Sequence, residues 1–201
     1  SDESKVKMKD FIYTTTPDAA KYAHKQVEEF ALKQERPLKE FHATLIFAIF
    51  KKYEFGYVVL TFGVGDCPIA VLYNDDGTDK LMLMNWLDVG EFGGGTRFIT
   101  MPEIFTDEKK LHTRVNCKIF KDFSYLMLMT DGIYDPKFVV EASLEKIEKW
   151  QEFLKDLDGN NDDQFKVEFN AGNKDIAAQL SKWMEFWSPG NHDDRTLAVV
   201  F

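Results

Sequence analysis

The stretch "LMLMTDGIYDP", residues 126–136, joins a run of large apolar residues directly to two aspartates, Asp131 and Asp135. The apolar run has the length and composition of a strand buried on both faces. A carboxylate beside a buried strand loses hydration, and it is tolerated there when hydrogen bonds or a cation compensate. We therefore expect the end of this strand to lie at a site for a divalent metal ion.

Acids also adjoin apolar strands at two other places in the chain. "VVLTFGVGD" ends at Asp66, and "GNHDDRTLAVVF" places Asp193 and Asp194 just before the last apolar run. Carboxylates that are distant in sequence but brought together by a sheet suit Mg²⁺ or Mn²⁺. Gly65 and Gly132, next to these acids, would allow close approach of the backbone. Taken singly, each acid is explained equally well as a turn residue or a cap.

Composition places the chain among globular proteins and excludes several functions. It has 201 residues, 44% of them hydrophobic, and 25 basic against 34 acidic residues give a net charge of −9. Without a basic cluster we expect no nucleic-acid partner, and without a long apolar run we expect no membrane span. Cys67 and Cys117 lack the spacing of a metal site, so we expect a reduced, cytoplasmic protein.

Hydrophobic periodicity predicts a helix, then a series of strands, then two helices and a last strand. The first helix is expected over 17–34, with Thr16 as its cap and Pro17 at its first position. Later helices are expected over 143–157, capped by Ser143, and over 173–187. Helices grouped outside a largely antiparallel sheet indicate an α+β protein. Strands are expected within 42–54, 56–66, 68–77, 79–87, 96–100, 115–120, 124–130 and 195–201.

Taken together, the three acidic segments resemble motifs of a known family. "GVGDCPIAVL", "LMLMTDGIYD" and "DDRTLAVV", in this order, are similar to motifs of the metal-dependent, 2C-type serine/threonine protein phosphatases (PPM), as are "FHATLIFAIF" at 41–50 and "GEFGGGTRFIT" at 90–100. The resemblance implies a four-layer α-β-β-α sandwich of two antiparallel sheets flanked by helices, incomplete at its N-terminal side. We expect a single domain over 17–201, preceded by an unassigned polar segment over 1–16.

The resemblance also implies a role for each acid. Asp131 and Asp193 would be ligands of a two-metal centre, and Asp66 and Asp135, with Asp131, would hold an additional ion. Asp194 stands where the family usually has Asn. Two Mn²⁺ or Mg²⁺ ions, or three in the complete protein, would activate a water that attacks the phosphomonoester. The expected metal site thus comprises Asp66, Asp131, Gly132, Asp135 and Asp193.

The family's first motifs, which include an acid that bridges both metals, have no counterpart in residues 1–16. They would lie in an N-terminal fragment or domain that completes the site, or they have been lost. Two functions therefore stay open: a metal-dependent phosphatase that acts on phosphoserine or phosphothreonine in proteins, or a catalytically inactive interaction or regulatory module. His192 is a candidate general acid in the first case and an ordinary loop histidine in the second.

Overall fold

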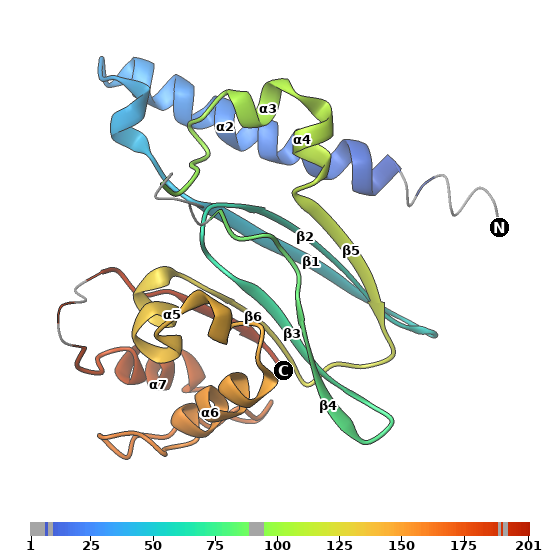
Figure 1. Ribbon diagram of the computed structural model, residues 1–201, viewed down its shortest axis with the longest axis vertical. Coiled ribbons are helices and arrows are strands. Elements are labelled where there is room, and N and C mark those ends of the chain that lie inside the picture. The colour runs from blue at the N-terminus through green and yellow to red at the C-terminus, as the bar shows by residue number, and fades with distance from the viewer. Residues whose placement is uncertain (1–6, 8–9, 89–94, 189, 191–192) are drawn as a thin grey trace. The chain divides into compact units, whose positions relative to one another are not determined.

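The computed structural model describes Lys7 and residues 10–88, 95–188, 190 and 193–201 (Figure 1). The chain forms two compact units, which are described separately below. Unit 1 contains residues 1–69 and 84–121, and unit 2 contains residues 70–83 and 122–201. Each unit combines one β-sheet with helices, so the expected α+β class with two antiparallel sheets is confirmed. The expectation of a single domain over 17–201 stays a prediction.

The sheet of unit 1 has the order β1-β2-β5. Strand β1 (Leu45–Tyr53) and β5 (Val115–Phe120) flank β2 (Gly56–Val64), and both pairings are antiparallel. Nearly all residues of the central strand β2 are buried, whereas the second half of β1 is exposed. The register places Phe47 opposite Phe62, and their rings stack at 5.4 Å.

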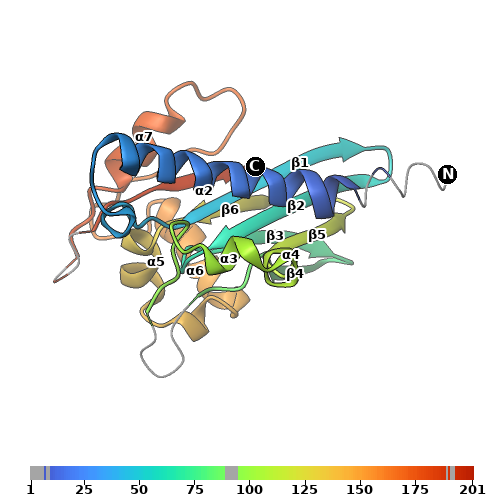
Figure 2. The ribbon, with the colours of Figure 1, turned by 90° about the horizontal axis from the view of Figure 1, so that it is seen from above.

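Helices cover one face of this sheet. Figures 1 and 2 show α2 running beside α3 and α4 on the same side of β1, β2 and β5. Pro17 lies in the first turn of α2 as expected, but Thr16 is not the cap. Thr16 is the first residue of α2, which follows η1 directly, and its hydroxyl donates to the carbonyl oxygen of Phe11 (3.0 Å). The helical elements of unit 1 are η1 (Phe11–Thr15), α2 (Thr16–Lys33), η2 (Leu38–Phe41), α3 (Glu103–Thr106) and α4 (Glu108–His112).

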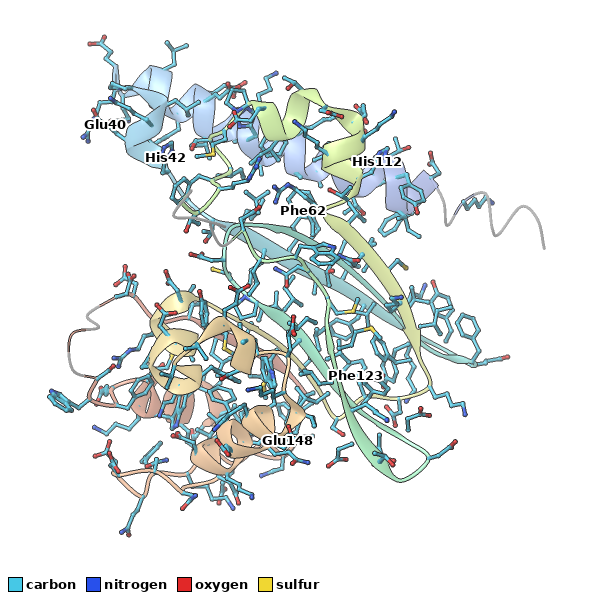
Figure 3. All side chains as sticks on the ribbon, viewed as in Figure 1. Glu40, His42, Phe62, His112, Phe123 and Glu148 are labelled. Atoms are coloured by element: carbon cyan, nitrogen blue, oxygen red, sulfur yellow. The ribbon has the colours of Figure 1, made fainter. Side chains whose placement is uncertain are left out.

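Phe62, labelled in Figure 3, is fully buried in the core between helices and sheet. The same hydrophobic cluster contains Ala20 of α2, Ile104 of α3 and Leu111 of α4. All three helices therefore pack on one apolar core. His24 is buried as well; its ring stacks on Phe105 at 4.5 Å, and its Nδ1 lies 2.6 Å from the carbonyl oxygen of Ile99.

The sheet of unit 2 has the order β4-β3-β6-β7. It contains β3 (Ile69–Asp75), β4 (Thr78–Leu83), β6 (Tyr125–Met129) and β7 (Leu197–Val200), and the β3–β4 and β6–β7 pairs are antiparallel. The side chain of Asn74 accepts a hydrogen bond from the Gly77 N–H in the turn of the β3–β4 hairpin (2.8 Å). The sequence of this turn, "NDDG", is typical of a hairpin.

An aromatic core holds the helices of unit 2 together. Trp150 is fully buried, lies 4.8 Å from Phe138 between ring centroids, and donates its indole N–H to the carbonyl oxygen of Leu144. Phe153 connects this pair to Trp183. The helical elements are α5 (Asp131–Phe138), η4 (Glu141–Ser143), α6 (Ile147–Leu157) and α7 (Ile176–Trp183).

Several of the expected elements and caps differ from the structure. Residues 96–100 form no strand; they follow an irregular path in which the N–H of Met101 turns back to Phe98. Ser143 does not cap α6, because it lies in the short helix η4 and Lys146 is the N-cap. The helix expected over 173–187 is limited to α7, since Asn173 bonds the Asp175 N–H and stabilises a turn instead.

No helix in the described part of the chain is long and apolar enough to cross a membrane.

Candidate functional site

In unit 2, β6 ends just before Asp131, the first of the acids expected at the metal site, and α5 begins at this residue. Asp131 is the first residue of α5 and is partly buried, a position where the helix dipole favours a negative charge. Its Oδ1 accepts a hydrogen bond from the Gly132 N–H (2.8 Å), which fixes the orientation of the carboxylate. The preceding strand is buried as expected, with Leu126, Met127 and Met129 at 0–1% exposure.

The loop before β7 lies directly against the start of α5. The hydroxyl of Thr130 donates to the carbonyl oxygen of Asp194 (3.2 Å) and accepts from the Thr196 N–H (3.0 Å). The Thr130 N–H also bonds the carbonyl oxygen of Thr196 (3.1 Å). In the same loop, Asp193 Oδ1 accepts from the Asp194 N–H (2.9 Å). The structure thus brings the backbones of the segments that carry Asp131 and Asp193 together.

Gly132 is the point of closest approach between these two segments. A Cβ atom at this position would overlap the carbonyl oxygen of Asp194, and it would lie 3.0 Å from the carbonyl carbon of Asp194 and 3.2 Å from the oxygen of Asp193. All three atoms are backbone atoms, which cannot swing away as a side chain can. The backbone of α5 approaches the 193–194 loop this closely because residue 132 has no side chain.

We expect Gly132→Ala to lower the free energy of unfolding by about 1–3 kcal/mol, because the new methyl group forces the two segments apart. Urea unfolding followed by circular dichroism measures the change. Gly95→Ala is the matched control, since a Cβ at residue 95 meets nothing within 4 Å. Equal stability of the two variants would contradict the close approach.

Asp135 and His192 are the other residues of unit 2 that were expected at the site. Asp135 lies in α5 four residues after Asp131, so it is on the same side of the helix, and it is exposed. Its carbonyl oxygen accepts from the Val139 N–H (3.0 Å). His192 lies outside the described residues.

In unit 1, Asp66 follows β2 in a loop that is held from several sides. Thr96 donates its hydroxyl to Asp66 Oδ2 (2.8 Å), which orients the partly buried carboxylate. Gly65 and Asp88 exchange two hydrogen bonds: the Gly65 N–H to Asp88 Oδ2 (2.8 Å), and the Asp88 N–H to the Gly65 oxygen (2.9 Å). Gly65 has φ +113°, a conformation that glycine adopts readily.

Arg114 forms a bidentate ion pair with Asp88. Its Nη1 and Nη2 donate to the two carboxylate oxygens of Asp88 at 2.7 and 3.0 Å, and Nη1 also reaches the carbonyl oxygen of Gly63 (3.2 Å). The side chains of Arg114 and Asp88 are only 13% and 16% exposed. Three residues before Asp88, the side chain of Asn85 accepts from the Ile69 N–H and donates to the carbonyl oxygen of Cys67, both at 2.8 Å.

Sequence reasoning missed Asp88, Asn85 and Arg114. Asp88 and Asn85 lie in "MNWLD", after β4 has ended at Leu83; Asn85 was expected inside the strand within 79–87, and Asp88 reads as an ordinary loop residue. An isolated Asn, Asp or Arg carries no spacing signal, so only the three-dimensional pairing identifies these residues as the support of the Asp66 loop.

The acids of the expected site are chemically suited to bind a hard divalent cation. Carboxylates are the ligands that Mg²⁺ and Mn²⁺ prefer, and Mg²⁺ commonly takes one or two of them and completes its shell with water and substrate phosphate. Within the residues that the structure describes, no group of three or more His, Cys, Asp or Glu could hold a metal ion. The described residues thus supply carboxylates of the right chemical kind at Asp131 and Asp193, but they form no complete metal site.

Other potentially reactive side chains of unit 1 are buried or engaged in contacts within the fold. Burial raises the pKa of the Cys117 thiol, which disfavours the thiolate that a cysteine nucleophile requires. His42 stacks on Phe98 at 4.6 Å and bonds the hydroxyl of Thr100. His112 bonds the carbonyl oxygen of Tyr13 (2.9 Å); both histidines are labelled in Figure 3.

Comparison with known proteins identifies the family. A family model described as "Protein phosphatase 2C" matches residues 4–185. The chain belongs to the protein phosphatase 2C family. The match begins inside the polar segment 1–16, and it ends before the loop that carries Asp193. A search of curated proteins found no match.

Two solved structures are similar to the chain, both of the phosphatase domain of the cell fate determinant SpoIIE from Bacillus subtilis. The first is 18% identical with a TM-score of 0.40, and covers 90% of this chain and 65% of the SpoIIE chain. The second, presoaked with Mn, is 18% identical with a TM-score of 0.43, and covers 98% and 70%, respectively.

Proposed function

We propose that this chain acts in a Mn²⁺- or Mg²⁺-dependent phosphatase that removes phosphate from serine and threonine in proteins. Asp131 and Asp193 would be the principal metal ligands, and Asp66 and Asp135 would contribute to a further ion. The observation that supports this most is the contact of Gly132 with the backbone of Asp193 and Asp194. It joins two segments that are 62 residues apart in sequence, both of which carry acids expected at the site.

The bound ions would polarise the phosphoryl group and activate the attacking water. The residues of the chain hold the carboxylates in place for this. Asp131 accepts from the Gly132 N–H and Asp193 from the Asp194 N–H, hydrogen bonds that would help to orient both carboxylates. Thr130 fixes the distance between the two segments through its hydroxyl.

Electrostatics explains why the proposed activity requires metal. A phosphomonoester is negatively charged near neutral pH, and it would approach Asp131 at the start of α5 and the loop that carries Asp193 and Asp194. Like charges at such short range repel one another unless cations lie between them. Metal removal is therefore expected to prevent substrate binding as well as chemistry.

The proposal is tested with p-nitrophenyl phosphate and a phosphothreonine peptide, using the chain with MnCl₂, with MgCl₂ and with EDTA. Hydrolysis of both substrates that depends on metal and stops with EDTA supports it. No turnover with metal in excess contradicts it for this chain.

A second candidate is a catalytically inactive interaction or regulatory module. It is favoured by one observation: among the residues that the structure describes, no three metal-ligating side chains form a cluster. A phosphatase whose remaining ligands come from an N-terminal fragment or domain is distinguished from such a module by adding that partner. Metal-dependent turnover that appears only in the mixture favours the phosphatase.

A cytoplasmic location is part of the proposal, in keeping with a phosphorylated protein as the substrate.

A further inference from the structure

Arg195 directly follows the two acids of the last loop, yet it is anchored to a different part of unit 2. Its Nη1 donates to the carbonyl oxygens of Met184 (2.5 Å) and Phe186 (2.7 Å), just beyond the end of α7. Its guanidinium carbon lies 3.9 Å from the centroid of the Phe186 ring. Arginine can make both contacts at once because its planar group stacks on a ring while its N–H groups point outward.

Phe186 is contacted by a second cation, which comes from α5. The ammonium group of Lys137 lies 4.0 Å from the centroid of Phe186 and 5.0 Å from that of Trp183. Lys137 is held there by Asp156 of α6 at 2.7 Å, and Asp156 also accepts the indole N–H of Trp183 at 2.7 Å. The side chain of Lys137 is 14% exposed, so these contacts are largely shielded from water.

Arg195 keeps this position although one of its donors is unsatisfied. Its Nε is buried and has no hydrogen-bond partner in the described part of the chain. An unsatisfied buried donor costs free energy, so the ring and the two carbonyl oxygens must outweigh that cost for the arrangement to persist. The contacts define a cation–aromatic clamp, which comprises Lys137, Phe186 and Arg195.

The clamp connects the two segments that carry the proposed metal ligands. Helix α5 has Asp131 at its first residue and Lys137 in its last turn, and the last loop has Asp193 two residues before Arg195. The start of α5 touches the loop through Gly132, and its end reaches the same loop through Phe186. Two separated attachments restrict rotation of the loop more than either one alone.

We propose that Arg195 is a positioning residue, which acts through the clamp to hold Asp193 in place beside α5. This inference rests on the proposed function only for its consequence, the affinity for metal. The positioning itself is a property of the loop and is measured without metal.

The decisive variants are Arg195→Gln, which removes the charge and the fork of donors, and Arg195→Lys, which keeps the charge. Amide hydrogen exchange without metal is expected to be faster over residues 193–196 in Arg195→Gln, and intermediate in Arg195→Lys. The Thr196 N–H is the most informative probe, since it is bonded to Thr130 in the native loop. Arg36→Gln is the matched control, because Arg36 also lies over a ring, that of Phe41 at 5.8 Å, but is exposed.

The second readout is Mn²⁺ binding measured by titration calorimetry, together with the Mn²⁺ concentration that gives half-maximal hydrolysis of p-nitrophenyl phosphate. Loss of a residue that orients a ligand typically weakens metal binding by about 10–100-fold, which is the change expected for Arg195→Gln. The KM for substrate at saturating Mn²⁺ should stay near the native value, because Arg195 is not proposed to touch phosphate.

The outcomes separate the two proposals. Native-like exchange over 193–196 in Arg195→Gln overturns the positioning role, whatever the metal results. Faster exchange with unchanged Mn²⁺ affinity also overturns it, since Asp193 would then not depend on the loop. A native chain that binds no Mn²⁺, alone or with an added N-terminal partner, overturns the proposed function, and the exchange experiment still decides the clamp.

Discussion

Asp131→Asn is expected to reduce metal-dependent hydrolysis of p-nitrophenyl phosphate by roughly 100-fold or more, because the lost negative charge weakens cation binding at the centre of the proposed site. Asparagine has nearly the same shape and keeps an oxygen that can accept from the Gly132 N–H. The fold should therefore persist. Initial rates measured against MnCl₂ concentration, together with the unfolding midpoint, separate a loss of metal affinity from a loss of structure.

Asp194→Asn is the control for a general effect of charge. It removes the same charge from the facing loop, but Asp194 contacts α5 and Thr130 through its backbone, which the substitution leaves unchanged. It also introduces the residue that the family usually has at this position. We expect activity within a few-fold of native. Equal activity of Asp131→Asn and the native chain would contradict the assignment of Asp131 as a ligand.

Arg114→Met is expected to lower the free energy of unfolding by about 3 kcal/mol, the low end of the cost of leaving one partner of a buried ion pair uncompensated, because this pair is partly buried. Methionine retains much of the apolar stem but cannot donate to Asp88 or to Gly63. Arg97, whose Nε lies 3.7 Å from Asp88, compensates only part of the charge, since its side chain is 49% exposed. Urea unfolding monitored by tryptophan fluorescence measures the change.

Arg36→Met is the control for the loss of an ion pair as such. Arg36 pairs with Glu40 on the surface, with 62% of its side chain exposed, so its removal should cost about 1 kcal/mol or less. If Arg114→Met and Arg36→Met destabilise equally, the pair with Asp88 does not support the Asp66 loop. Arg114→Met should also reduce metal-dependent activity if Asp66 takes part in the site.

The expected strands other than 96–100 were predictable from sequence, because alternation and turn residues are local signals. "NDDG" marks the β3–β4 hairpin, and the continuous apolar run at 126–129 marks the buried strand β6. The helices α3 and α4 were missed, because segments of four and five residues are too short to show helical periodicity. Helix α5 was missed because "DG" reads as a turn, although Asp is also favourable in the first turn of a helix.

The expected site residues came from motif resemblance, and their metal-binding roles stay predictions. The sequence could not identify the residues that hold those acids in place. Arg114 and Asp88 are 26 residues apart, and Arg195 reaches Lys137 only through the ring of Phe186. Such pairings depend on which surfaces meet in the folded chain, and a single sequence contains no periodic or compositional trace of them.

The hydroxyl of Thr130 has a consequence for how this protein can diverge. One oxygen atom serves both a carbonyl in the loop and an amide at the start of the last strand. Serine alone among the other small residues offers the same double capacity, whereas valine, equal in shape, offers neither half of it. A protein of this family with an aliphatic residue here would lose both of these hydrogen bonds, and backbone contacts such as the bond from the N–H of residue 130 to the oxygen of residue 196 would have to join the two segments.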